Sequence, residues 1–295
     1  MNFRKLEITD KHIFDKFVKE KGNLRSIYNF TTLYIWSGDG KVKIAVENDV
    51  LYILWDFGKK SFMMYPISDG GNIKAAIMKA TEYLQNLGAK PKFRSLDANN
   101  VLELKALSPD SFYFDYDRDG SDYLYDAERL ISLSGKKLHS KKNHYNAFSK
   151  NYNFTYRRIT EKDIDDCKAL FDLWYKDKDE NTKLLLESRE ATFKLLDNLQ
   201  ELDVVGGLIE VDSKIIACSV GERISKDTAL IHVEFANTDY RGAYAAINRE
   251  FAKNEWADCK YINREEDMGD EGLRKAKESY QPIGLIDVYK ATLKD

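Results

Sequence analysis

The chain has 295 residues, 43% of them hydrophobic and 13% aromatic, and carries a formal net charge of −3. The length exceeds that of a usual single domain and predicts two, at residues 1–150 and 151–295. The apolar content is sufficient for packed cores, and the charge excludes an overall polycation.

The cysteines and the apolar runs indicate the compartment. Cys167, Cys218 and Cys259 are widely spaced, without a CxxC pair or neighbouring histidines. This pattern favours a reducing compartment and buried thiols and argues against a zinc site. The charged N-terminus lacks an apolar signal-peptide core, and the apolar runs are far shorter than the ~20 residues of a membrane span. We therefore expect a soluble, cytoplasmic protein with no metal site and no stable membrane insertion.

The first half reads as strands, helix, strand and helix, which indicates an α/β or α+β layer domain. We expect a helix at 11–18, a β-prone segment at 30–37, strands at 41–46 and 50–56 around a turn at 47–49, a strand at 61–67, a helix at 72–87 closed by Gly88, a strand at 93–96, and a helix capped by Asp97 that ends at Leu107.

Residues 115–120 copy the first half of a calcium-binding EF-hand loop, with aspartates at alternate positions followed by Gly120. The match then fails, because position twelve is Asp126 and residues 112–116 read as a strand where an entering helix is required. A polar turn between aromatic strands is therefore the preferred interpretation, with calcium as the alternative.

Residues 133–158 are strongly basic and contain no acidic residue. Their cations include Lys136, Lys137, Lys141 and Lys142, and an apolar face formed by Leu138, Tyr145, Phe148 and Tyr152 leaves the lysines largely on other faces of one helix. Such a cluster attracts a phosphate backbone or an anionic headgroup. The alternative is an ordinary solvated basic helix.

The second half begins with a strand at 154–159 and a capping-box variant, Thr160-x-x-Asp163. Helices are expected at 164–175 and 181–199, and strands at 202–211, 215–222 and 229–235, the first two joined at Asp212 and Ser213. Residues 233–284 then read as strand, turn, helix, strand, helix and strand, and residues 283–293 as the closing strand.

The turn before the helix at 240–251 contains Arg241 and Gly242, and Thr238 or Asp239 is expected to cap that helix, as Asp270 caps the next. A strand that leads into a helix N-terminus aims several backbone donors at one point, which suits a phosphate or carbonyl oxygen. Any strand–helix junction has the same form, so a purely structural turn is the alternative.

The order β-α-α-β-β-β-α-β-α-β from residue 154 resembles the GNAT acyltransferase superfamily. Tyr280-Gln281-Pro282-Ile283-Gly284-Leu285 is similar to that superfamily's Y-x-x-x-G-F ending, and Arg241-Gly242-Ala243-Tyr244-Ala245-Ala246 is similar in part to its R/Q-x-x-G-x-G/A phosphate loop. Tyr244 stands where the superfamily has a glycine, and a side chain there crowds the seat of the coenzyme A pyrophosphate. The resemblance therefore implies the fold and favours a donor other than coenzyme A.

A closer resemblance covers nearly the whole chain. Its motifs are Asp122-Tyr123-Leu124-Tyr125, Leu133-Ser134-Gly135-Lys136-Lys137-Leu138-His139, Lys141-Lys142-Asn143, Asn146-Ala147-Phe148, Glu234-Phe235-Ala236-Asn237, Tyr240-Arg241-Gly242-Ala243-Tyr244, Ile247-Asn248 and Lys275-Ala276-Lys277-x-x-Tyr280-x-Pro282. They resemble the soluble bacterial proteins that are similar to the C-terminal catalytic domain of phosphatidylglycerol lysyltransferase.

This resemblance implies an α/β (α+β) fold of two tandem GNAT-like domains, each a mixed, mostly antiparallel sheet flanked by helices, and an aminoacyl or acyl transferase. In the lysyltransferases a charged tRNA donates lysine to a lipid headgroup hydroxyl, and Fem-type peptidyltransferases use related tandem domains. We expect no membrane-spanning half in this chain, so a bilayer lipid is not implied as its acceptor.

Acyl transfer needs an acceptor for the nucleophile's proton, donors for the developing oxyanion and an acid for the leaving group. Glu234, near the end of its strand, is a candidate to orient the nucleophile or to bind the donor's amino group. Arg241 and the first-turn N–H groups are candidates to hold a phosphate or carbonyl oxygen. The alternative for Glu234 is a surface carboxylate that pairs with a lysine. The alternative for Arg241 is an ordinary surface arginine at a helix start.

Further candidates follow from the resemblance. Tyr280 occupies the place of the leaving-group acid of many GNAT enzymes, and Lys277 matches a lysine that contacts a carbonyl or the tRNA acceptor end. Asn237 and Asn263 end neighbouring strands and can bind polar groups of the donor, and Tyr244 lines the same site. The alternatives are that Tyr280 is an ordinary core residue, that Lys277 is a solvated helix lysine, and that the two asparagines only terminate their strands. His232, on a strand, reads as a packed core histidine.

We therefore predict transfer of an aminoacyl group from charged tRNA to a small or lipid-like acceptor, with no further cofactor. The basic helix at 135–150, placed at the domain junction, is expected to engage phosphates through Lys136, Lys137, Lys141 and Lys142. The alternatives are an acetyl-coenzyme A-dependent N-acetyltransferase, with Tyr244 packed aside, and a non-catalytic module that binds an anionic ligand.

Overall fold

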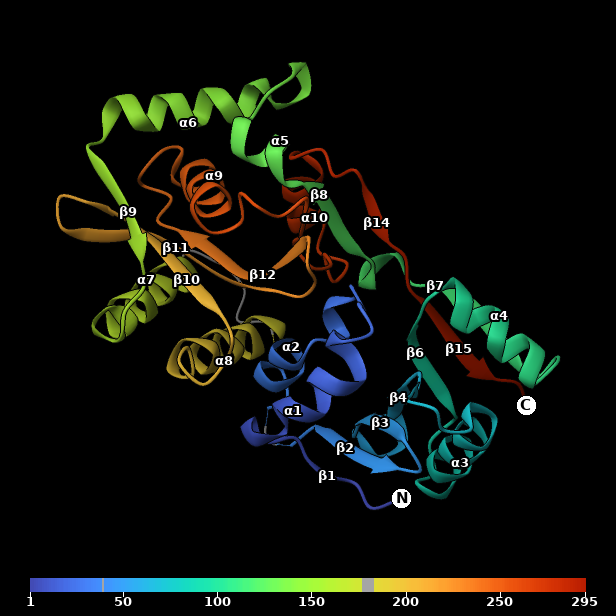
Figure 1. Cartoon of the computed structure of the whole chain (residues 1–295). Helices are drawn as coiled ribbons and strands as arrows, with labels where there is room; N and C mark the ends of the chain where they lie inside the picture. Colours follow the sequence, from blue (N-terminus) through green and yellow to red (C-terminus); the bar gives the residue numbers. More distant parts are fainter. Residues whose placement is uncertain (39, 177–182) are drawn as a thin grey trace. The chain divides into compact units, whose positions relative to one another are not determined.

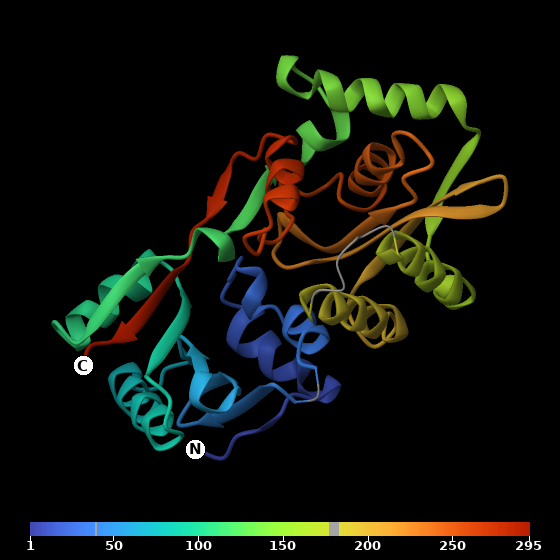
Figure 2. The ribbon, with the colours of Figure 1, turned by 180° about the vertical axis from the view of Figure 1, so that it is seen from behind.

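The computed structural model describes residues 1–38, 40–176 and 183–295. The chain forms two compact units, each with one sheet flanked by helices (Figures 1 and 2). Unit 1 consists of Met1–Ser121 together with Ile286–Asp295, and unit 2 consists of Asp122–Leu285.

The sheet of unit 1 is mixed and mostly antiparallel. Its spatial order is β1 (Arg4–Lys5), β2 (Val42–Glu47), β3 (Val50–Trp55), β4 (Phe62–Met64), β6 (Lys92–Leu96), β15 (Tyr289–Leu293) and β7 (Phe112–Tyr116), and β5 (Ile67–Ser68) pairs with β3. Strands β4 and β6 run parallel, and α3 (Ile73–Asn86) connects them. The β2–β3 hairpin turns at Asn48 and Asp49, both with positive φ, as a two-residue hairpin turn requires. The predicted hairpin is thus confirmed.

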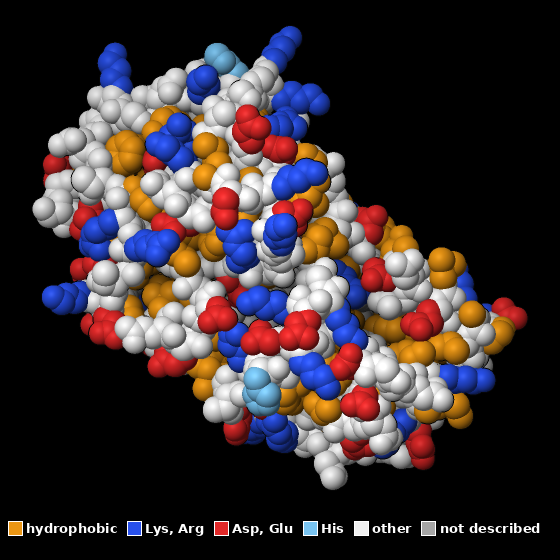
Figure 3. Space-filling view, in the orientation of Figure 1, with side chains coloured by type: hydrophobic (Ala, Val, Ile, Leu, Met, Phe, Trp, Pro, Cys, Tyr) orange, Lys and Arg blue, Asp and Glu red, His pale blue; other side chains and the backbone are white. Residues whose placement is uncertain are grey.

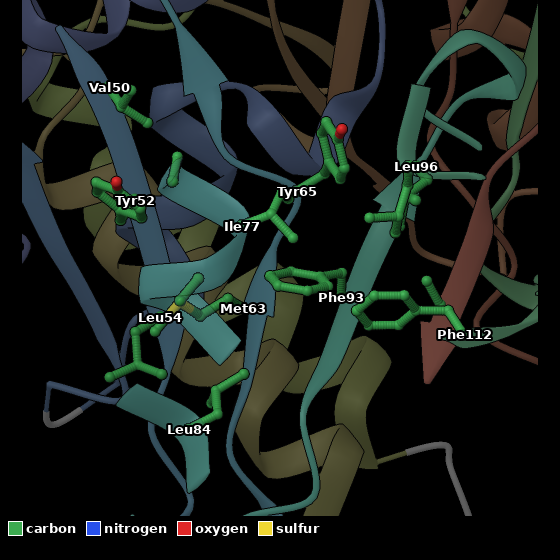
Figure 4. Close-up of a cluster of buried hydrophobic side chains, with 14 of the residues drawn as sticks. Val50, Tyr52, Leu54, Met63, Tyr65, Ile77, Leu84, Phe93, Leu96 and Phe112 are labelled. Atoms are coloured by element: carbon green, nitrogen blue, oxygen red, sulfur yellow. The ribbon is translucent and has the colours of Figure 1, made fainter. Parts of the chain in front are cut away.

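The core of unit 1 lies between its sheet and the helices α3 and α4 (Ala98–Leu107) (Figure 4). Strand residues such as Leu54, Met63 and Phe93 pack against Ile77 and Leu84 of α3. Both helices begin where the sequence predicts, because the side chains of Asn72 and Asp97 accept first-turn N–H groups.

The N-terminal segment differs from one expectation. Residues 30–37, predicted as β-prone, form the helix α2 (Phe30–Ile35), which Asn29 caps by accepting the Thr32 N–H. Phe30 and Leu33, one helical turn apart, are both buried. Tertiary burial and the cap therefore override the β propensity of this short aromatic segment. The preceding helix is α1 (Lys11–Phe14), which continues as a π-helical turn at Asp15–Lys19.

The sheet of unit 2 has the order β14 (Gly284–Ile286), β8 (Asp122–Asp126), β13 (Tyr261–Asn263), β12 (Thr228–Ala236), β11 (Lys214–Arg223), β10 (Val205–Val211) and β9 (Phe154–Arg158). Helices α5 (Ala127–Ser132), α6 (His139–Asn151) and α9 (Ala243–Glu255) lie over one face, and α7 (Ile164–Lys176) and α8 (Lys183–Asp197) over the other (Figures 1 and 2). Helix α10 (Glu271–Glu278) precedes β14. Strands β12 and β13 run parallel, and α9 connects them.

The predicted element order from residue 154 is confirmed up to the last strand. Thr160 and Asp163 form the expected capping box, and Asp270 caps α10. Helix α9, however, begins at Ala243 with Gly242 at its N-cap, so neither Thr238 nor Asp239 caps it. The helix predicted at 181–199 is described only from Lys183 onward, so its first two residues lie outside the described ranges.

The division of the chain differs from the one expected at residue 150. Strand β8 pairs with β13, and Tyr123 and Tyr125 of β8 are buried in the core of unit 2, so residues 122–150 belong to that unit. The basic helix α6 accordingly packs on α9. The closing strand predicted at 283–293 is two strands, because Asp287 and Val288 lie in neither strand and β15 joins the sheet of unit 1.

The EF-hand-like residues form a polar turn, as preferred from the sequence. Asp117 follows β7 and precedes a short 3-10 turn that leads to β8. Its carboxylate forms an ion pair with Lys290 at 2.7 Å. Across the described residues, no group of three or more histidine, cysteine or acidic side chains is arranged to hold a metal ion. None of the described helices has the length and apolarity to cross a membrane.

Candidate functional site

The centre of the candidate site is the Glu234 carboxylate on β12. Its Oε1 accepts a hydrogen bond from Arg264 Nη2 at 2.9 Å, and its Oε2 accepts one from Asn248 Nδ2 at 3.0 Å. Arg264 directly follows β13, and Asn248 lies on α9. The parallel pair β12–β13 and its connecting helix therefore bring the three side chains together, at the place where parallel strands usually bind ligands.

Tyr280 lies beside two cations in this cluster. The Lys141 Nζ is 4.2 Å and the Arg264 Cζ 4.8 Å from the centre of its ring, distances at which cation–π attraction is favourable. Burial and the nearby Glu234 charge raise the pKa of Tyr280, so its hydroxyl stays protonated at neutral pH. Burial and Arg264 lower the pKa of Lys141, against the opposing effect of Glu234. Glu234, Asn248, Arg264, Tyr280 and Lys141 are called the Glu234 cluster below.

Two polar atoms of the Glu234 cluster have unused hydrogen-bonding capacity. Arg264 Nη1 and Asn248 Oδ1 are buried and have no hydrogen-bond partner among the described residues. A buried polar group without a partner costs about 1–3 kcal/mol, and native proteins keep few of them. A free donor and a free acceptor next to a carboxylate therefore point to a ligand that supplies both partners.

Lys277 and Asn263 support the loop that carries Arg264. The Lys277 amine is buried and donates to the backbone carbonyls of Arg264, at 2.6 Å, and Glu266. Asn263 is fully buried; its amide donates to Asp122, and its oxygen accepts the Glu265 N–H. Both predicted site residues thus hold backbone and side chains of unit 2, which is a positioning role.

The remaining C-terminal candidates lie in or next to the turn before α9, and their side chains have different surroundings. Arg241 is exposed and has no ion pair or hydrogen bond to a side chain among the described residues. Asn237 shapes the turn, because its side chain accepts the Asp239 N–H. Tyr244 packs inward against the core below α9, and burial raises its pKa to about 12. Gly242 has a φ of +97°, and a side chain there would meet the His144 carbonyl of α6.

The lysines of the basic segment divide into two groups. Lys141 turns inward to Tyr280 and is half-buried. Lys136, Lys137 and Lys142 are exposed, and within the described part of the chain they have no charged partner. Figure 3 shows Lys and Arg side chains along the surface over α6. The segment therefore offers one cation within the Glu234 cluster and three exposed cations. Lys136 and Lys137 lie in a 3-10 turn just before α6 and Lys142 lies on α6, and we call these three lysines the α6 face.

His232 is buried, as the sequence indicates, but it is an ion-pair centre. Its Nε2 lies 3.0 Å from Glu222 Oε1, and its Nδ1 lies 3.1 Å from Glu265 Oε1. Burial disfavours the charged ring, but the hydrogen bonds to the two glutamates outweigh this effect and raise the pKa of His232 to about 9. Burial also raises the pKa of Glu266, which has Glu265 and Asp122 as acidic neighbours.

Replacing His232 with glutamine is expected to remove a pH-dependent part of the stability. A raised folded-state pKa means that the imidazolium stabilises the fold fully below pH 6.5 and that this contribution is lost as the pH rises through about 9. Near pH 6 the free energy of unfolding of the wild type should exceed that of the variant by up to about 3 kcal/mol. Urea unfolding midpoints across this range measure the difference, and a gap that stays constant with pH would contradict the assignment.

Sequence reasoning did not select Arg264 or Asn248 as site residues. Asn248 occurs within the quoted motif Ile247-Asn248, which is the signal that marks it. Arg264 follows Asn263 in an acidic loop, where a surface cation is the ordinary interpretation. Only the pairing of β12 with β13 shows that this arginine reaches the Glu234 carboxylate.

Solved structures share the fold of the whole chain. A conserved protein of unknown function from Bacteroides thetaiotaomicron is 34% identical, with a TM-score of 0.91 and all of both chains covered. L-PGS from Bacillus licheniformis is 15% identical, with a TM-score of 0.66 over 98% of this chain and 92% of that chain. FemX is 10% identical, with a TM-score of 0.62 over 97% of each chain. A tandem GNAT protein also shares the arrangement, so the predicted fold of two GNAT-like units is confirmed.

Sequence comparison identifies the family. An uncharacterised protein of Mycoplasmoides gallisepticum is 24% identical over 176 residues, and the chain spans about half the length of this curated relative. Residues 22–292 match the family model described as phosphatidylglycerol lysyltransferase, C-terminal. This match extends over both units and includes every residue of the Glu234 cluster. The chain therefore belongs to the family of phosphatidylglycerol lysyltransferase C-terminal domains.

Proposed function

We propose that the Glu234 cluster transfers an aminoacyl group from a charged tRNA to a small or lipid-like acceptor. Family and fold are those of acyl- and aminoacyltransferases. The observation that carries the proposal is the free Arg264 donor and the free Asn248 acceptor beside the Glu234 carboxylate. An aminoacyl ester supplies a carbonyl oxygen for the donor and an ammonium group for the acceptor.

The reaction needs few groups beyond this cluster. The acceptor's hydroxyl or amine attacks the ester carbonyl carbon, a new C–O or C–N bond forms, and the bond to the tRNA ribose oxygen breaks. Arg264 and Lys141 stabilise the negative charge that develops on the carbonyl oxygen. Glu234 accepts a hydrogen bond from the nucleophile or from the donor's ammonium group. The protonated Tyr280 hydroxyl is the acid for the leaving ribose oxygen. The nucleophile releases its own proton to the medium as the new bond forms, and the medium returns one proton to Tyr280.

The α6 face is proposed to bind the phosphates of the donor. Its lysines are exposed and unpaired within the described residues, so they can neutralise phosphates without first breaking protein ion pairs. Lys141 belongs to the same segment and contacts Tyr280. One short stretch of chain can thus place an acceptor stem near the Glu234 cluster. Binding through phosphates is expected to weaken steeply with salt, because counterions are released on association.

Reversing the charge of the α6 face tests this part of the proposal. The triple variant Lys136→Glu, Lys137→Glu, Lys142→Glu is expected to lose tight binding of bulk aminoacyl-tRNA. The slope of log K against log salt is negative, and its magnitude should decrease by roughly 2–3, about one unit per lost phosphate contact. Fluorescence anisotropy over a salt series measures both quantities.

A matched control comes from unit 1. Lys59, Lys60 and Lys74 are also exposed, and the described residues provide them no charged partner. Their reversal makes the same change in net charge and should leave the salt slope almost unchanged. Equal losses in the two triple variants would mean that net charge alone governs binding and would contradict a docking role for the α6 face.

Coenzyme A-dependent acetyl transfer is the second candidate, because Tyr244, which stands in place of the superfamily's glycine, packs against the core. A calorimetric titration with acetyl-coenzyme A distinguishes the two donors. Binding of acetyl-coenzyme A without binding of tRNA would favour the acetyltransferase. Binding of tRNA without transfer to any acceptor would favour a module that binds its ligand and does not turn it over.

A further inference from the structure

Unit 1 contains a cavity of about 570 Å³ that the proposed function does not use. It opens where the chain leaves the parallel strands β4 and β6, since its walls include Tyr65 and Pro66 after β4 and Asp97 after β6. Ligands of open α/β sheets bind at this end of parallel strands. The volume is within the usual range for small-molecule sites. Position and size therefore both fit a binding site.

Two of the residues that line the cavity, Tyr28 and Tyr65, are held firmly in place. Tyr28 and Tyr65 are 1% and 3% exposed, and the Tyr28 hydroxyl donates to the Tyr65 carbonyl at 3.1 Å. The Tyr65 hydroxyl donates to Glu103 Oε2 at 2.9 Å. Tyr65 also packs edge-on to Phe93 of the core, beside which Figure 4 shows it. These contacts leave the two rings little freedom, so this part of the lining is formed before any ligand binds.

The cations of the cavity wall are already paired within the protein. Arg25 stacks on the Tyr28 ring at 4.5 Å and donates to the Ser95 carbonyl, and its Nη2 lies 3.4 Å from Asp97. Lys21 donates to the Ser68 carbonyl at 2.6 Å and pairs with Asp69 at 3.0 Å. Neither side chain therefore offers a free positive charge to an anionic ligand.

Glu103, unlike these two cations, has no ion-pair partner among the described residues. It is exposed at the cavity, and the Tyr65 hydroxyl is the partner found for its carboxylate among the described residues. Its charge is not matched by an ion pair there, and one oxygen remains available. The free capacity of the cavity is thus a carboxylate acceptor in a lining that also contains the two tyrosines and apolar side chains such as Phe17, Ile67 and Ile73. This combination suits an ammonium group, through a charge-assisted hydrogen bond, attached to an apolar body.

We propose that the unit 1 cavity binds a small primary amine with an apolar body, of the size of an amino-acid amide or a peptide N-terminus, with Glu103 as the ammonium acceptor. The site shares no residue with the Glu234 cluster and does not depend on the aminoacyl-transfer proposal. It gives unit 1 a recognition function of its own for amine-bearing molecules.

Calorimetry with three probes of matched shape tests the proposal. At mildly acidic pH leucinamide is a cation, leucine is a zwitterion and N-acetylleucinamide is neutral. The full-length protein is expected to bind leucinamide most tightly, leucine more weakly and N-acetylleucinamide not measurably. Glu103→Gln keeps an acceptor for the Tyr65 hydroxyl but removes the charge, and should weaken leucinamide binding about tenfold or more.

Two control variants make the outcome specific. Glu82→Gln removes the same charge from an exposed position of α3 outside the cavity and should leave leucinamide affinity unchanged. Glu210→Gln removes the same charge from unit 2, outside the Glu234 cluster, and should also leave it unchanged. Equal binding of the three probes, or unaltered binding by the Glu103 variant, would overturn the proposal. An equal loss in either control variant would mean that the effect does not depend on Glu103 and would equally overturn the proposal.

Discussion

Replacing Arg264 with methionine is expected to destabilise unit 2 by about 3–5 kcal/mol, because it leaves the Glu234 carboxylate buried without its ion-pair partner. The side chains of Arg264 and Glu234 are only 12% and 9% exposed, so water cannot replace the lost contact at low cost. Asn248 alone would remain as a hydrogen-bond donor to the carboxylate. Urea unfolding followed by tryptophan fluorescence measures the loss.

A double-mutant cycle separates the charge from the packing. If the loss arises from the unpaired carboxylate, the double variant Arg264→Met, Glu234→Gln should be markedly less destabilised than the sum of the single variants. Arg223→Met provides a matched control, since Arg223 pairs with Asp258 at the surface of the same unit. Exposed pairs contribute about 0–1 kcal/mol. Equal losses at Arg223 and Arg264 would contradict the importance of the buried pair.

The fold could be predicted from the sequence wherever local signals and tertiary contacts agree. Asn72, Asp97 and Asp270 cap helices as expected, because capping depends on residues within one turn. Residues 30–35 could not be assigned correctly, since their helix depends on burial from both sides. The division between units could not be found either, because it depends on β8 pairing with β13 and on β15 joining the other sheet, and these pairings are non-local.

For the candidate site, too, local sequence signals identify positions but not the non-local contacts of their side chains. Glu234, Tyr280 and Lys141 were selected from motifs, and the structure brings them into one cluster. Lys277 carries the same motif signal, but its amine binds two backbone carbonyls. A motif marks a position that matters without stating which way its side chain points. The direction comes from packing, which also explains why Arg264 was missed.

The Glu234→Gln variant is expected to reduce transfer by about 10²–10⁴-fold, the usual range for loss of a positioned acid–base group. Glutamine is nearly isosteric and can still accept from Arg264, so the variant keeps this hydrogen bond but loses the charge that orients the nucleophile or the donor ammonium. Part of the stability of the buried pair is lost with that charge, so transfer is compared under conditions where unfolding curves show both proteins folded. Because the α6 face is unchanged, tRNA affinity and its salt slope should stay near the wild-type values.

The measurement is protein-dependent release of a radiolabelled amino acid from bulk aminoacyl-tRNA, with hydroxylamine as a small acceptor and the spontaneous reaction subtracted. Glu210→Gln is the matched control, since Glu210 pairs with Arg157 on a neighbouring strand outside the cluster and its loss should leave transfer unchanged. Transfer that survives in the Glu234 variant within a few-fold would remove Glu234 from the reaction. Absence of transfer in the wild type, with tRNA still bound tightly, would instead leave the Glu234 cluster as a recognition site, and the free Arg264 donor would then serve affinity alone.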